Sequence, residues 1–251
     1  MLKMKTLLLF DLDNTLTLSR GKATNEMKEM LKNLDTTKYD LGVVSGSDLT
    51  KIREQLEEAV NHFKWIFTEN GLVTYFDHQP TPYSSTSLVK HLGEGYYQEL
   101  VNKCLSHLAN TKLPVKRGTF LELRTGLLNI CPIGRSCTQE EREEFEKYDK
   151  LNLIRQDMCR YLSHSLMHLK LKFSIGGQIS IDAFPQGWDK TYCLQFVEGK
   201  YKNIYFYGDN IRPGGNDYEI GFDSRVIPHK VNNWKDTFDL LNELILETDM
   251  S

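Results

Sequence analysis

The stretch TLLLFDLDNT, residues 6–15, decides the fold of this chain. Residues 5–10 form an almost uninterrupted apolar run, which is typical of a strand buried on both faces of a parallel sheet. Similar runs occupy residues 39–44 and 203–207, and helical spacing of apolar residues follows the first two runs, at 25–34 and from Leu49 onwards. We therefore predict an α/β fold with a doubly wound parallel-sheet core.

The pattern changes after residue 80, where long helical stretches and hairpins replace the strand–helix alternation. Helices are predicted at 88–109 and 152–169, and a capping box at Thr138–Glu141 predicts the start of a third. Short apolar runs predict two hairpins, one spanning 119–131 and one spanning 171–184. This order predicts an inserted α+β cap domain, residues 82–185, in a core domain made of residues 1–81 and 186–251.

The composition indicates which kinds of partner and which compartment to expect. The chain has 251 residues with 31 Lys plus Arg against 34 Asp plus Glu, a net charge of −3, so we expect neither a nucleic-acid nor a membrane partner. No apolar run approaches the roughly 20 residues that a membrane span needs. Five cysteines without a C-x-x-C pair indicate reduced thiols, and we predict a cytoplasmic protein.

Carboxylates follow two of the predicted parallel strands. Asp11 and Asp13 come directly after the first strand, and Asp209 and Asp217 follow the strand at 203–207. In open α/β sheets, ligands bind at the carboxyl ends of the strands. Carboxylates that converge there repel one another unless a cation lies between them, and Mg²⁺ prefers oxygen ligands. The sequence therefore predicts a Mg²⁺ site at this edge of the sheet.

Two further elements suit a phosphoryl group. Ser45 and Ser47 follow the second strand and open a helix, where hydroxyl and amide groups can hydrogen-bond phosphate. Lys190 offers a positive charge. Each of these residues alone is as consistent with an ordinary turn or helix cap, because Asp, Asn, Gly and Ser are common in loops. Their combination in this order, after the appropriate strands, favours phosphoryl transfer.

The motifs resemble those of a known group of proteins. DLDNTLT (11–17), SGS (45–47), Lys190 and GDN…GGND (208–217) are similar to the four motifs of the haloacid dehalogenase superfamily. RGTFLELR (117–124), PIGRSCTQEER (132–142) and FSIGGQISIDAFPQGWDK (173–190) resemble the eukaryotic phosphomannomutase family, and the similarity extends across nearly the whole chain. The resemblance implies a haloacid dehalogenase-like core with a substrate-specificity cap.

The resemblance implies a Mg²⁺-dependent mutase that interconverts mannose 6-phosphate and mannose 1-phosphate, supplies GDP-mannose synthesis and is activated by a hexose 1,6-bisphosphate. In such enzymes the residue at Asp11 attacks phosphorus and forms an aspartyl phosphate, while that at Asp13 is the general acid/base. A carboxylate can carry a phosphoryl group, and a second one can move a proton only if it is not the nucleophile. Lys190 is expected to offset charge on the phosphoryl oxygens.

The implied metal ligands are Asp11, the main-chain carbonyl of Asp13, Asp209 and Asp217, with a second cation near Phe222 and Asp223. Two positions depart from the family pattern. Asn14 stands where Gly is usual, and Asn is among the few other residues that tolerate positive φ. The second motif reads SGS rather than GGS, so either Ser45 or Ser47 can be the phosphate contact; we assign Ser47.

The cap is expected to bind the far end of the sugar phosphate. By resemblance, Arg124, Arg135 and Arg142 bind the distal phosphate, with Arg20 contributing from the core. Ser180 and Asp182 alternate with apolar residues, which places them on one strand face, and family members use them for sugar hydroxyls. The alternative is that the arginines are solvated surface charges, with Arg142 paired to a nearby Glu on its helix. The resemblance also implies a homodimer through the cap.

Two other functions use similar residues. A sugar-phosphate phosphatase of the same superfamily shares the Asp11 chemistry, but water instead of a sugar hydroxyl accepts the phosphoryl group. A two-component receiver also combines an acidic cluster, a hydroxyl and a Lys on a doubly wound core. Receivers lack an inserted arginine-bearing module, and their phosphorylated Asp follows a later strand, so the mutase is favoured.

Overall fold

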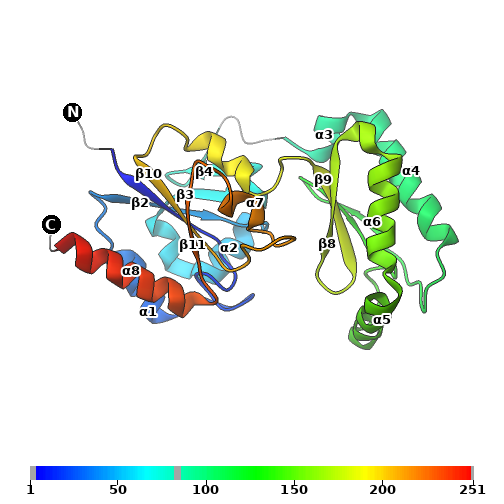
Figure 1. Cartoon of the computed structure of the whole chain (residues 1–251), viewed down its shortest axis with the longest axis horizontal. Coiled ribbons are helices and arrows are strands. Elements are labelled where there is room, and N and C mark those ends of the chain that lie inside the picture. The colour runs from blue at the N-terminus through cyan, green and yellow to red at the C-terminus, as the bar shows by residue number, and fades with distance from the viewer. Residues whose placement is uncertain (1–3, 82–85, 250–251) are drawn as a thin grey trace. The chain divides into compact units, whose positions relative to one another are not determined.

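The computed structural model describes residues 4–81 and 86–249 (Figure 1). The chain divides into two compact units: the core domain, Met1–Ser85 with Gly187–Ser251, and the cap domain, Thr86–Gln186. The chain therefore passes twice between the two units. Residue 82, where the sequence places the start of the cap, lies outside the described residues.

The core domain is built on a seven-stranded sheet of order β11-β10-β1-β2-β3-β4-β5. The first five of these strands pair in parallel, and β4 and β5 extend the sheet antiparallel. The strands are β1 (Thr6–Phe10), β2 (Tyr39–Val44), β3 (Phe63–Thr68), β4 (Val73–Phe76), β5 (Gln79–Pro80), β10 (Asn203–Gly208) and β11 (Ile227–Lys230). The three apolar runs of the sequence are thus neighbouring strands of one parallel sheet, and the predicted fold class is confirmed.

Both faces of this sheet are buried. On β1, Leu8 and Phe10 join the core beneath one layer of helices, whereas Leu7 and Leu9 join a second core on the opposite face. The first layer consists of α1 (Asn25–Asn33), α2 (Leu49–Leu56) and α8 (Trp234–Asp249), and α1 and α8 lie side by side in Figure 1. The second layer contains the 3₁₀ helix η4 (Lys190–Phe196) and α7 (Tyr218–Gly221). This double burial explains why the strands read as continuous apolar runs.

The strand order reverses between β1 and β10. The chain runs from β1 through β2 to β3 on one side, and β10 later pairs with the other side of β1. The main-chain amide of Asp11 donates to the carbonyl of Tyr207 at 2.8 Å, so the ends of these two strands lie against each other. A reversal of this kind opens a crevice at the carboxyl ends of the strands, where ligands bind in this class of fold.

The cap domain is a four-stranded antiparallel sheet of order β6-β7-β9-β8 with helices packed on it. Its strands are β6 (Leu121–Leu123), β7 (Leu128–Ile130), β8 (Leu171–Gly176) and β9 (Ser180–Pro185), and its α-helices are α3 (Leu88–Leu92), α4 (Glu94–Asn110), α5 (Gln139–Asn152) and α6 (Ile154–Ser165). Both predicted hairpins are present. The capping box is present at the start of α5.

Two predicted helices are wrong in their extent: the one over 152–169 ends as an α-helix at Ser165, and a separate 3₁₀ turn, Met167–Leu169, follows it. The sequence predicts a single helix over 88–109, but the chain breaks between α3 and α4 at Gly93. Gly93 has φ of +77° and ψ of 153°, a conformation that L-residues with a side chain rarely adopt. The glycine therefore ends one helix and starts the next in another direction.

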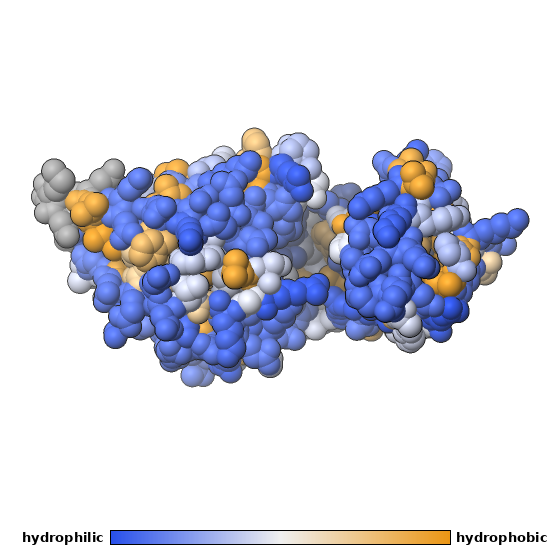
Figure 2. Space-filling model, turned by 90° about the horizontal axis from the view of Figure 1, so that it is seen from below, coloured by the Kyte–Doolittle hydropathy of each residue, from blue (hydrophilic) through white to orange (hydrophobic). Residues whose placement is uncertain are grey.

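Polar residues cover most of the face shown in Figure 2, and hydrophobic residues appear there as small separate groups. Within residues 4–81 and 86–249, no helix combines the length and apolar character that crossing a membrane requires.

Candidate active site

Three carboxylates converge where β1 and β10 end. Asp11 follows β1, Asp209 follows β10, and Asp217 directly precedes α7. One oxygen atom from each lies within 4.8 Å of the other two, and this is the only cluster of metal-ligating type in the described part of the chain. Asp11 and Asp217 are 4% and 0% exposed, and Asp209 is partly exposed. The acidic cluster at the strand reversal is therefore buried at Asp11 and Asp217 and partly exposed at Asp209.

The carboxylate of Asp217 lies so close to Gly208 that a residue with a side chain would not fit at position 208. A Cβ atom added to Gly208, the last residue of β10, would lie 2.7 Å from Oδ2 of Asp217. The same oxygen accepts a hydrogen bond from the Asn210 amide at 3.0 Å. Glycine at this strand end thus lets Asp217 approach the end of β10.

Lys190 lies inside the acidic cluster. It is 2% exposed, starts η4, and its Nζ donates to Oδ1 of Asp11 and, at 2.6 Å, to Oδ1 of Asp217. Burial alone would lower the pKa of this amine, but the two adjacent carboxylates outweigh it and raise the pKa, so Lys190 stays charged. The amine therefore carries a permanent positive charge beside the proposed nucleophile.

Burial also acts on the carboxylates. It raises the pKa of Asp11 to about 7, with Asp217 adding to the rise and Lys190 opposing it. Burial and Asp217 likewise raise the pKa of Asp209, against a hydrogen bond from Asn14. With all three carboxylates ionised against one ammonium, the cluster has a formal charge of minus two. This balance and the all-oxygen donor set fit Mg²⁺.

The carboxylate of Asp13 makes hydrogen bonds outside this cluster. Its Oδ1 accepts from the main-chain amide of Arg20 at 2.5 Å and from Nε2 of Gln55 at 3.0 Å. The metal-type cluster of the described residues does not include its carboxylate. Asp11 and Asp13 thus occupy different environments, as a nucleophile and a proton carrier require.

Two residues near the site were not predicted to act there. Gln55 is buried on α2 and also donates to Thr17 Oγ1 and to the carbonyl of Gly21, which ties the loop after β1 to this helix. Asn14 has φ of +58°, and its Nδ2 donates to Oδ2 of Asp209 at 3.2 Å. A buried Gln on an otherwise apolar helix face was the available signal for Gln55; the partner of Asn14 is distant in sequence.

The two serines of the second motif differ in exposure. Ser45 is buried, and its Oγ accepts from the amide of Ser47 at 3.1 Å. Ser47 is partly exposed and precedes α2, whose N-cap is Asp48. Of the two hydroxyls, that of Ser47 is the more accessible.

The residues assigned to a second cation lie outside the acidic cluster. Both carboxylate oxygens of Asp223 accept from Arg225, at 2.8 and 2.7 Å, and this partner lowers the pKa of Asp223. Phe222 is 70% exposed. The second cation at these residues stays a prediction.

Three arginines of the cap, Arg124, Arg135 and Arg142, form one connected group. Arg135 and Arg124 share Oε2 of Glu122, at 2.8 and 3.2 Å, and Arg142 donates to the main-chain oxygen of Arg135 at 3.3 Å. Among the residues that the structure describes, no Glu pairs with Arg142. The pairing with a Glu on its own helix, which the surface-charge alternative proposes for Arg142, is therefore not seen among these residues, and the three guanidinium groups form a cationic surface only partly neutralised by Glu122. Arg20, from the core domain, is exposed.

Ser180 and Asp182 lie on β9, where the burial alternates as the sequence predicts. Ile181 and Ala183 are buried, whereas Ser180 and Asp182 are partly exposed on the opposite face. The Oγ of Ser180 donates to the carbonyl of Gly176 at 2.9 Å.

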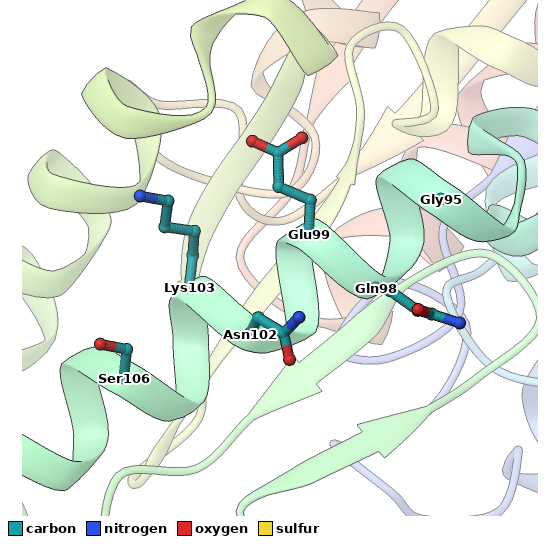
Figure 3. Close-up of a pocket in the computed structure, with 6 residues that line it drawn as sticks. All are labelled: Gly95, Gln98, Glu99, Asn102, Lys103 and Ser106. Carbon is teal, nitrogen blue, oxygen red and sulfur yellow. The ribbon is translucent and has the colours of Figure 1, made fainter.

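A hollow of about 470 Å³ lies along α4 in the cap, away from the candidate site residues in sequence. Figure 3 shows the six that line it, all from α4: Gly95, Gln98, Glu99, Asn102, Lys103 and Ser106. None of the candidate site residues lines this hollow.

Comparison with known proteins places the chain in a family. A model of the eukaryotic phosphomannomutase family matches residues 27–247. The chain is 49% identical over 242 residues to "Phosphomannomutase 1" of Dictyostelium discoideum, covering 95% of this chain and 96% of that protein. It is also 49% identical over 230 residues to a phosphomannomutase of Arabidopsis thaliana, covering 91% and 92%.

Solved structures show the same fold at low sequence identity. Trehalose-6-phosphate phosphatase of Aspergillus fumigatus aligns with a TM-score of 0.58 at 15% identity, covering 96% of this chain and 92% of that one. IMP-nucleotidase of Plasmodium falciparum aligns with a TM-score of 0.60 at 14% identity, covering 97% and 68%. Family match, full-length relatives and fold agree: this chain belongs to the eukaryotic phosphomannomutase family.

Proposed function

We propose that the protein is a phosphomannomutase that interconverts mannose 6-phosphate and mannose 1-phosphate and so supplies GDP-mannose synthesis. The observation that carries the proposal is the buried cluster of Asp11, Asp209 and Asp217 around Lys190 at the strand reversal. The near full-length similarity to phosphomannomutases supports the choice of substrate.

In this proposal Asp11 is the nucleophile. A carboxylate oxygen of Asp11 forms a bond to phosphorus of a hexose 1,6-bisphosphate, and the bond from phosphorus to the sugar oxygen breaks. The resulting aspartyl phosphate passes its phosphoryl group to the free hydroxyl of a hexose monophosphate. The bisphosphate so formed turns round and returns its other phosphoryl group to Asp11, which releases the isomeric monophosphate. A trace of bisphosphate therefore acts as the activator.

Asp13 moves the proton in each half-reaction. It protonates the leaving sugar oxygen and later takes the proton from the attacking hydroxyl. Both of its hydrogen bonds, from Arg20 and Gln55, fall on Oδ1. We assign the transferred proton to Oδ2, because neither of these two hydrogen bonds uses that oxygen.

Charge on the phosphoryl group is offset from two sources. Mg²⁺ held by Asp11, Asp209, Asp217 and the Asp13 carbonyl would supply positive charge to the phosphoryl oxygens. Lys190 supplies a second positive charge from inside the cluster. The hydroxyl of Ser47 completes the set as a hydrogen-bond donor.

The cap is proposed to bind the rest of the substrate. Arg124, Arg135 and Arg142, together with Arg20, bind the phosphate that is not reacting, because guanidinium groups bind phosphate in a bidentate manner. Ser180 and Asp182 hydrogen-bond sugar hydroxyls. Their exposure on one strand face supports this role.

We also propose a homodimer formed through the cap, acting in the cytoplasm. Large apolar side chains exposed on the cap helices support the dimer: Tyr96, Leu105 and Tyr161. The absence of disulfides among the five cysteines agrees with a reducing compartment.

A turnover assay tests the function. The protein is incubated with mannose 1-phosphate, Mg²⁺ and a trace of glucose 1,6-bisphosphate, and mannose 6-phosphate and free phosphate are measured together. The proposal predicts mannose 6-phosphate with little free phosphate, and a rate that falls without bisphosphate. Free phosphate equal to the sugar consumed, without mannose 6-phosphate, would instead identify a phosphatase.

A further inference from the structure

A row of polar side chains crosses the cap sheet. Glu122 on β6 pairs in register with Asn129 on β7, Asn129 pairs with Asp182 on β9, and Asp182 pairs with Ser174 on β8. Residues paired in register point to the same face of a sheet. The row therefore places Asn129 between Glu122 and Asp182, and the next residue, Ile130, points into the cap core on the other face.

Asn129 is the buried member of this row. It is 2% exposed, whereas Glu122 and Asp182 are partly exposed. Both ends of its side-chain amide are used: Nδ2 donates to Oδ1 of Asp182 at 2.6 Å, and Oδ1 accepts from Nη1 of Arg135. Buried polar atoms without partners are costly, so this amide fixes both neighbours in place.

The two neighbours carry opposite charges. An amide has one donor end and one acceptor end, and is therefore suited to join a carboxylate to a guanidinium. Arg135 is held from the other side by Glu122 through its Nε at 2.8 Å. A carboxylate at position 129 has no donor for Asp182, and an apolar side chain leaves both Asp182 and Arg135 without this partner.

We propose that Asn129 is a positioning residue that sets the spacing between Arg135 and Asp182, and thereby the fit of a phosphohexose between a phosphate contact and a hydroxyl contact. The proposal rests on the proposed function, because it takes Arg135 as a phosphate contact and Asp182 as a sugar contact. Asn129 itself touches no substrate; it acts through its two hydrogen bonds.

The test compares Asn129→Leu and Asn129→Asp with wild type in two measurements. Steady-state kinetics with mannose 1-phosphate separate KM from kcat, and calorimetry measures mannose 1-phosphate binding directly. We expect both variants to raise KM and the dissociation constant by about 10- to 100-fold, the usual effect of losing hydrogen bonds to charged groups. We expect kcat to stay within about threefold, because the groups around Asp11 are unchanged.

The matched control is Ile130→Val. It removes a methyl group from the neighbouring buried residue of the same strand and lowers the thermal midpoint without touching the amide. We expect its KM to stay within about twofold of wild type. The comparison is made where Ile130→Val and Asn129→Leu lower the thermal midpoint by the same amount. If Ile130→Val then raised KM as much as Asn129→Leu, the role of Asn129 would be merely structural and the proposal would fail.

A double-mutant cycle adds a second criterion. Asn129→Leu combined with Asp182→Ala is expected to weaken binding less than the product of the two single effects, because both changes break the same contact. Additive effects would contradict the proposal. If the wild type lacks mutase activity, the proposed function fails, and the calorimetric comparison still decides on Asn129.

Discussion

Asp11 meets two conflicting requirements at the scale of a single residue. As the proposed nucleophile, it must be buried to exclude water from its phosphorylated form, and it must be ionised to attack phosphorus. Burial and Asp217 raise its pKa to about 7, and Lys190 limits the rise. The lysine thus keeps a buried carboxylate close to ionisation at neutral pH.

Replacing Asp11 by Asn should abolish activity without lowering the stability of the fold. An amide cannot carry the phosphoryl group, so we expect activity to fall by at least about 10³-fold. Since a neutral amide relieves repulsion with Asp217 while Lys190 keeps Asp217 as its partner, the thermal midpoint of the metal-free protein should not decrease. The turnover assay and thermal melting check this, and full activity of the Asp11→Asn protein would overturn the assignment.

The raised pKa of Asp11 predicts a pH dependence of Mg²⁺ binding. Only the ionised carboxylate binds the cation, so binding releases a proton below pH 7. We expect the apparent Mg²⁺ affinity to fall about tenfold for each pH unit below 7 and to level off above it. Calorimetry at pH 6, 7 and 8 measures the affinity. An affinity that is constant from pH 6 to pH 8 would contradict the raised pKa.

The raised pKa of Asp11 also determines whether the free energy of unfolding rises or falls with pH. The native state holds the Asp11 proton more tightly than the unfolded chain, whose carboxyl pKa is near 3.8. In the metal-free protein, this group therefore lowers the free energy of unfolding as pH rises from about 4 to about 7. The loss is complete above pH 7, where Asp11 is ionised in both states.

At the scale of elements, strand recognition depends on how completely the apolar run is preserved. β2 has the predicted bounds, because all six of its residues are buried. β3 was not predicted; Lys64 interrupts its run as Asp40 interrupts that of β2, and these two side chains pair at 3.2 Å. The β4–β5 hairpin was also missed. Its turn residues Asp77 and His78 have positive φ but lack the Asn-Gly signature.

The capping box of α5 supports a prediction at this scale. The Oγ1 of Thr138 accepts from the amide of Glu141 at 3.2 Å, and the Glu141 carboxylate accepts from the Thr138 amide at 3.0 Å. We expect Thr138→Ala to lower the free energy of unfolding by about 1 kcal/mol. Chemical denaturation measures this, with Ser136→Ala as the control at an exposed nearby position. Equal stability of the two variants would contradict a role for the box.

At the scale of the whole molecule, the two units carry different parts of the proposed function. The core holds the acidic cluster and the cap holds the connected arginines. The sequence indicated which carboxylates meet, because strand ends at one edge of a sheet are close whatever their separation in sequence. It could not indicate the Gln55–Asp13 or Asn129–Arg135 contacts, which depend on side-chain directions within packed elements.

Because the two sets of residues lie in different units, we expect Arg142→Ala to weaken substrate binding without weakening Mg²⁺ binding. Its guanidinium contacts the Arg135 carbonyl within the cap, whereas the metal-type cluster lies in the core. We expect KM to rise about tenfold or more, with Mg²⁺ affinity unchanged and the thermal midpoint little altered. Kinetics, calorimetry and melting check the three quantities. A loss of stability that matches the loss of binding would favour a surface-charge role.

Asp11 is the residue that we propose carries the phosphoryl group. The most direct measurement is an acid quench of the protein after brief exposure to Mg²⁺ and glucose 1,6-bisphosphate labelled in its phosphate, followed by mapping of the labelled peptide. We expect label on Asp11, and none in the Asp11→Asn protein. Label on another residue, or label retained in Asp11→Asn, would contradict it.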